Sequence, residues 1–168
     1  MSVQAIAGVS ASSEAKIMTE FPSVAVTALG QLLGQLFRLI PVRIFGMYLS
    51  TLLFALPVAP LGALLFLYTK AFGSRYVLTN RSVQIWSALG DQRRQSVSLA
   101  EIADVELVQS PGQDFYRASD IRLKASNGQT LMTLAGISDA GSFATAIRRA
   151  VKAHTLVQQS LKTIAARG

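Results

Sequence analysis

The chain has 168 residues, enough for one domain or for one small domain with a membrane anchor. It has no cysteine and one histidine, which excludes disulfides, thiolate chemistry and cysteine-ligated metal sites. Most of the net charge of +7 arises in the second part of the chain, because residues 70–168 hold thirteen basic and seven acidic side chains.

The first forty residues divide into a polar tail and an apolar periodic segment. Residues 1–21 lack the positive start and apolar core of a secretory signal, so we expect a loosely ordered cytoplasmic tail. Residues 22–40 place leucines on one side of a helix and Gln31, Gln35 and Arg38 on another, with Pro22 at its start. The pattern favours an amphipathic helix in the membrane interface, with a first transmembrane helix as the alternative.

Residues 44–68 carry no charge over 25 consecutive positions and are the membrane segment of the chain. Pro57 and Pro60 lie in the middle of this run, where each removes a backbone donor. Two shapes follow. Either a single helix kinks and crosses the bilayer, or the chain turns back at residues 57–62 as a re-entrant hairpin that keeps both flanks on one side. The membrane-associated region as a whole spans residues 22–70.

Residues 71–154 show the mixture of short alternating strands expected of a soluble domain. Six strands are predicted, at residues 75–78, 82–86, 93–98, 103–109, 121–124 and 130–135. Thr79 and Asn80 close the first hairpin, and Asn127-Gly128 closes the last one. An amphipathic helix follows, and residues 155–168 continue it or form a tail. The fold class is therefore mainly β with α, an antiparallel meander with one helix closing an open end.

Three segments of the chain resemble the bacterial pleckstrin-homology-like (PH) family of small membrane proteins. They are RYVLTNRSV, SLAEIADVELVQS and DIRLKASNGQTLMTLAGISDAGSFATAIRRA, and the resemblance covers residues 70–152. It implies a bent antiparallel β-barrel capped by a C-terminal helix and facing the cytoplasm. It implies no activity. Phosphoinositide specificity is not carried over, because the first hairpin is short where the lipid-binding PH domains have a long basic loop.

Two groups of residues are candidate binding sites. The first is a juxtamembrane basic surface that would contact anionic lipid headgroups. Its members are Lys70, Arg75, Arg81, Arg93 and Arg94. The second is a loop with two aromatic side chains that would contact a partner protein. Its members are Gln113, Asp114, Phe115, Tyr116 and Arg117.

No motif for catalysis, metal binding or a cofactor is present. His154 has no nucleophile or carboxylate motif near it, and the acidic residues do not follow a metal-ligand spacing. Nucleic acid is a poor fit, because the basic residues are scattered and accompany no recognition motif. We therefore expect a non-catalytic adaptor at the bacterial cytoplasmic membrane that docks a partner protein, with binding of anionic lipid headgroups as the alternative.

Overall fold

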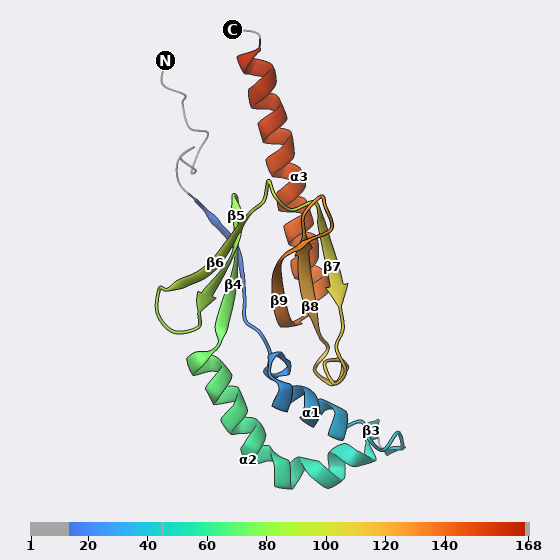
Figure 1. Ribbon diagram of the computed structural model, residues 1–168. Helices are drawn as coiled ribbons and strands as arrows, with labels where there is room; N and C mark the ends of the chain where they lie inside the picture. The colour runs from blue at the N-terminus through green and yellow to red at the C-terminus, as the bar shows by residue number, and fades with distance from the viewer. Residues whose placement is uncertain (1–13, 45, 167–168) are drawn as a thin grey trace.

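The computed structural model describes residues 14–44 and 46–166, which form β-sheets flanked by helices (Figure 1). The strands are β1 (Lys16–Glu20), β2 (Arg43–Ile44), β3 (Met47–Tyr48), β4 (Ser74–Thr79), β5 (Ser82–Ser87), β6 (Arg93–Ser98), β7 (Asp104–Val108), β8 (Ala118–Lys124) and β9 (Thr130–Ser138). The helices are η1 (Val24–Val26), α1 (Ala28–Leu36), α2 (Leu49–Phe72), η2 (Asp114–Tyr116) and α3 (Ala140–Ala165).

The six predicted strands are confirmed as β4 to β9, but they do not form the closed barrel that we expected. One antiparallel sheet has the order β1-β4-β5-β6, a second has the order β7-β8-β9, and β2 and β3 form a separate hairpin. Between β6 and β7 the chain buries Leu99 and Ile102 in the core. β6 and β7 do not pair, so the two sheets are open between these strands.

β1 comes from the segment that we expected to be a loosely ordered tail. It pairs with β4 in antiparallel register, with Lys16 opposite Thr79 and Glu20 opposite Tyr76. After β1 the chain crosses to the second sheet, where Ser23 N donates to Gly136 O at 2.8 Å. Residues 14–20 are therefore part of the domain, while residues 1–13 lie outside the described part of the chain.

The core lies between the two sheets and is closed by the first half of α3. Alternate residues of the strands point inward, and Phe143 and Ile147 of α3 are fully buried against them. Tyr76 joins the sheets, because its hydroxyl group donates to Ala135 O at 3.0 Å and accepts from Ala135 N at 3.1 Å. The predicted C-terminal extension is helical as far as Ala165.

The predicted helix over residues 22–40 is wrong in its extent. Thr27 is extended and its side chain accepts from Gly30 N, so α1 starts there rather than at Pro22. Pro22 instead forms an isolated bridge with Ile137. At nine residues α1 is about 14 Å long, too short to be a transmembrane helix.

α1 docks on the loop of residues 110–117 through direct contact between backbones. A Cβ atom on Gly34 would lie 2.2 Å from Gly112 O, and one on Gly112 would lie 2.1 Å from Gln31 O. Beyond this contact, the Phe37 and Phe115 rings pack with centroids 5.0 Å apart, and Arg38 forms an ion pair with Asp114. Only glycine allows this approach, since any side chain at either position would separate α1 from the loop.

The docking of α1 predicts that alanine destabilises the protein more at Gly112 than at Gly128. Gly112 and Gly128 both have positive φ, at +86° and +81°, but a Cβ on Gly128 would meet nothing within 4 Å. Both alanine substitutions carry the strain of positive φ, about 1 kcal/mol. Gly112→Ala adds the clash with α1, about 1–3 kcal/mol of overpacking. We expect Gly112→Ala to lower the thermal unfolding temperature in mild detergent by clearly more than Gly128→Ala does. Equal shifts would contradict the docked position of α1.

Candidate functional site

α2 is an apolar helix that is exposed along almost its whole length. It has no charged residue before Lys70, and its buried residues are Ser50, Leu65 and Thr69. Its exposed apolar side chains are Leu52, Leu53, Leu56, Leu61, Leu64, Phe66, Leu67, Tyr68 and Phe72. Among the described residues it is the one helix long and apolar enough to cross a membrane, as judged by length and composition. Its 24 residues extend over about 36 Å.

The helix runs through both prolines without a break, so the predicted alternative of a turn at residues 57–62 is wrong. Figure 1 shows that α2 is bent, with its two ends directed toward the rest of the molecule and the bend farthest from the sheets. Pro57 and Pro60 lie near the middle of α2 and explain the bend, because each lacks the amide that the helix ladder requires.

Both ends of α2 are attached to the domain. At the start, Leu49 N donates to Val42 O at 2.8 Å, and the Ser50 hydroxyl group, which is fully buried, donates to Phe37 O. At the other end, Ala88 N, just after β5, donates to Gly73 O at 3.0 Å, and the chain continues directly into β4. The two ends of the apolar helix therefore meet the same folded unit.

Further exposed apolar residues lie on α1, on the β2-β3 hairpin and on the segment that joins them. They are Leu29, Leu32, Leu39, Val42, Ile44 and Met47. Together with the exposed side chains of α2 they form what we call the apolar face. α1, the hairpin and α2 occupy one end of the molecule (Figure 1), so the apolar face is concentrated there. Exposed apolar surface of this extent marks an interaction site.

Three of the predicted basic residues gather where α2 meets the first sheet. Lys70 Nζ lies 4.6 Å from the centre of the Phe21 ring. Arg75 forms an ion pair with Asp91 at 3.0 Å and lies over Trp86. Arg94 donates to Ser74 Oγ at 3.2 Å and to Phe72 O at 3.5 Å.

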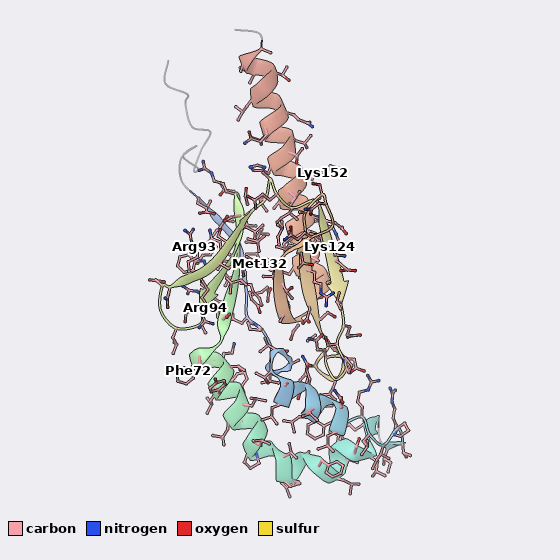
Figure 2. All side chains as sticks on the ribbon, viewed as in Figure 1. Phe72, Arg93, Arg94, Lys124, Met132 and Lys152 are labelled. Carbon is pink, nitrogen blue, oxygen red and sulfur yellow. The ribbon has the colours of Figure 1, made fainter. Side chains whose placement is uncertain are left out.

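The two remaining predicted basic residues differ in position. Arg93 precedes Arg94 at the start of β6, but Figure 2 shows it farther from Phe72 at the end of α2 than Arg94 is. Its charge instead helps to lower the pKa of Glu14, which accepts hydrogen bonds from Thr79 and Ser82 at the other end of β4. Arg81 follows β4 at its far end and lines a groove beside α3. Of the predicted basic surface, Lys70, Arg75 and Arg94 therefore lie where α2 meets the first sheet, whereas Arg81 and Arg93 do not contact the end of α2.

The predicted partner loop has a structural task that the sequence did not reveal. Gln113 is fully buried, where it accepts from Ser110 N at 2.9 Å and donates to Asp120 Oδ1 at 2.6 Å. Phe115 and Asp114 contact α1, as described above, and Phe115 also packs edge-on against Tyr116. Arg117 is exposed and has positive φ. Partner binding by this loop stays a prediction.

Among the residues that the structure describes, four ionisable groups have clearly shifted pKa values, and each shift has a structural cause. Burial raises the pKa of Tyr76 to about 12, and burial also raises the pKa of Tyr116. Hydrogen bonds from the Ser82 and Thr79 hydroxyl groups lower the pKa of Glu14, while burial raises that of Glu20. Within the described ranges, no group of three or more His, Asp or Glu side chains is placed to hold a metal ion.

Comparison with known proteins places the chain in a family. No curated protein matches it in sequence. A family model described as Bacterial PH domain matches residues 24–151, which is most of the chain and includes α1, α2 and all six strands from β4 to β9. The apolar helix α2 therefore lies within the residues that the family model matches. The chain belongs to the bacterial PH domain family.

Proposed function

We propose that the chain is a non-catalytic adaptor held on one leaflet of the bacterial cytoplasmic membrane, where its PH domain docks a partner protein on the cytoplasmic side. The observation that carries this proposal is the apolar face, whose main element α2 is exposed although it has no charged residue before Lys70. Transfer of one exposed leucine side chain from water to an apolar phase is favourable by about 1.5–3 kcal/mol, and the face holds many such side chains.

The positions of the two ends of α2 support attachment to one leaflet. A spanning helix has its ends on opposite sides of the bilayer. Here the start of α2 is held by α1, which is docked on the loop of residues 110–117, and its end continues into β4 of the same domain. A bent helix inserted from one side, with Pro57 and Pro60 at its deepest point, keeps both attachments.

The charges beside the apolar face favour the cytoplasmic side. Arg38 and Arg43 precede α2, and Lys70, Arg75 and Arg94 surround its end. In the one-leaflet arrangement all five lie on the same side of the membrane. Basic residues next to membrane segments concentrate on the cytoplasmic side, so the two flanks favour the same orientation.

The proposal predicts that lysines in α2 release the chain from membranes. Leu56 and Leu64 are 86% and 65% exposed, and a lysine at the centre of an inserted helix costs about 2.5–3.5 kcal/mol. We expect the wild-type chain to float with membranes after a high-salt wash, and Leu56→Lys/Leu64→Lys to be found mostly in the non-floating fraction. The control replaces two exposed leucines of α3, Leu156→Lys/Leu161→Lys, and should float like the wild type. Release of the wild-type chain by salt alone would contradict insertion of the apolar face.

Direct contact with anionic lipid headgroups is the second candidate function. It is favoured by the position of Lys70, Arg75 and Arg94 around the end of α2. A headgroup beside an inserted α2 would come within reach of these side chains. Each basic side chain near an anionic surface contributes about 1 kcal/mol, or roughly fivefold in affinity.

Native mass spectrometry of the full chain in micelles doped with anionic or neutral phospholipid tests this candidate. The full chain is needed because β1 completes the sheet that carries β4. We expect Lys70→Gln/Arg94→Gln to lower occupancy by anionic lipid at least about fivefold, because two charges beside the headgroup are removed. Arg81→Gln removes one charge at the far end of β4 and should leave occupancy unchanged. Equal occupancy by neutral lipid, or an equal loss in Arg81→Gln, would contradict headgroup recognition at this position.

A further inference from the structure

The ammonium group of Lys70 lies against two aromatic rings that come from different parts of the chain. Lys70 Nζ is 4.6 Å from the centre of the Phe21 ring and 5.6 Å from the centre of the Phe66 ring. Phe66 precedes Lys70 by about one turn of α2, so the two side chains share a face of the helix. Phe21 reaches the same ammonium group from the segment that follows β1. Contacts between a cation and the face of an aromatic ring at such distances are attractive.

The backbone holds Phe21 in place on both sides. Before it, β1 pairs with β4 as far as Glu20. After it, Pro22 forms a bridge with Ile137 of β9. Phe21 therefore lies at the point where the chain crosses from the first sheet to the second, and both sheets determine where its ring can be.

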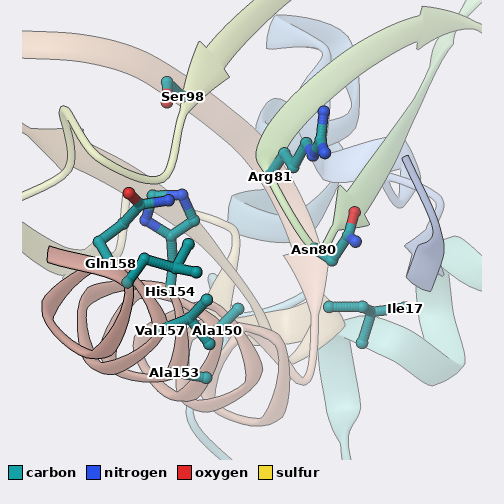
Figure 3. Close-up of a pocket in the computed structure, with 10 residues that line it drawn as sticks. Ile17, Asn80, Arg81, Ser98, Ala150, Ala153, His154, Val157 and Gln158 are labelled. Atoms are coloured by element: carbon teal, nitrogen blue, oxygen red, sulfur yellow. The ribbon is translucent and has the colours of Figure 1, made fainter. Parts of the chain in front are cut away.

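The start of β1 is fixed as well, at the turn between β4 and β5. The Glu14 carboxylate accepts a hydrogen bond from the Ser82 hydroxyl group, and Ala15 N donates to Asn80 Oδ1 at 2.9 Å. β1 adds little to the core, because none of its side chains is fully buried. Ile17 is 55% exposed and lies with Asn80 at the wall of a groove of about 670 Å³ (Figure 3). The contacts of β1 thus hold a segment at the edge of the sheet, and that segment leads to Phe21.

Lys70 gains a fixed direction from this arrangement. It is an exposed residue in the last turn of α2, and a free lysine side chain has many rotamers. The two rings restrict these rotamers before any ligand arrives, so less conformational entropy is lost when the ammonium group binds an anion. An ammonium group has three donors, and those directed away from the rings can reach a phosphate oxygen.

We infer that Phe21 is a positioning residue that directs the Lys70 ammonium group toward the phosphate of an anionic phospholipid beside the end of α2. The inference rests on the proposed headgroup contact and names a residue that orients one of its lysines. A lipid is the source of the phosphate because Lys70 comes at the end of the apolar face, where Phe66 is 50% exposed. Phe21 acts through Lys70 and needs no contact of its own with the headgroup.

A double-mutant cycle tests the inference on the full chain, by native mass spectrometry in micelles doped with anionic or neutral phospholipid. Phe21→Leu keeps an apolar side chain but removes the ring, so we expect an affinity for anionic phospholipid that is lower by at least about twofold. The affinity for neutral phospholipid should not change, and Phe21→Tyr, which keeps a ring, should bind like the wild type. In a chain that also carries Lys70→Gln, Phe21→Leu should cause no further loss, because no ammonium group remains to be positioned. An equal loss with and without Lys70 would overturn the inference.

Phe72→Leu is the matched control for the loss of an exposed ring. Phe72 is 68% exposed at the same end of α2, and its ring packs on Tyr68. We expect Phe72→Leu to change the affinity for anionic phospholipid by less than about 1.5-fold. A loss as large as that of Phe21→Leu would show that the rings act by entering the membrane, and would overturn the inference.

The single substitution Lys70→Gln separates the two ways in which the account can fail. If Lys70→Gln weakens binding of anionic phospholipid but Phe21→Leu does not, the headgroup contact stands and the positioning role of Phe21 is wrong. If Lys70→Gln leaves binding unchanged, Lys70 makes no headgroup contact, and the contact and the positioning role both fail.

Discussion

The backbone contact between Gly34 and Gly112 is the constraint on which the functional account depends. Because a Cβ at either position would lie within about 2.2 Å of a carbonyl oxygen of the other segment, α1 can dock only where both residues are glycine. The docked α1 fixes Phe37, whose carbonyl group accepts from Ser50 at the start of α2. The start of the apolar helix is thereby held on the domain into which its end also continues.

This arrangement gives the molecule two ends with different surfaces. One end carries α1, the β2-β3 hairpin and the bent α2, with exposed apolar side chains and arginine and lysine beside them. The other end carries the projecting half of α3, where Leu156, Val157, Leu161 and Ile164 are exposed. The sheets lie between them, tied together by the Tyr76 hydroxyl group at Ala135. In our account the first end attaches the molecule to the membrane.

Local patterns in the sequence predicted what depends on neighbouring residues, and missed what depends on distant ones. Alternation in segments such as Ile121 to Lys124 located the six strands, and the long uncharged run located α2. β1 was missed because its partner β4 is about sixty residues away, as in the pairing of Lys16 with Thr79. The task of Phe115 and Asp114 was missed for the same reason, since Phe37 and Arg38 lie far from them in sequence. The bend of α2 could be predicted from Pro57 and Pro60, because it depends on local chemistry. The attachment of both ends of α2 to the same domain could not be predicted, because it depends on contacts with distant residues.

The one-leaflet arrangement is tested most directly by the side of the membrane on which the two flanks of α2 lie. The chain has no cysteine, so Gln35→Cys before α2 and Ser126→Cys after it each introduce a single thiol at an exposed position. We predict that a membrane-impermeant thiol reagent leaves both unlabelled in intact cells and labels both in inverted membrane vesicles. Labelling of Gln35→Cys in intact cells, with Ser126→Cys labelled only in inverted vesicles, would show that α2 crosses the bilayer and would contradict the account.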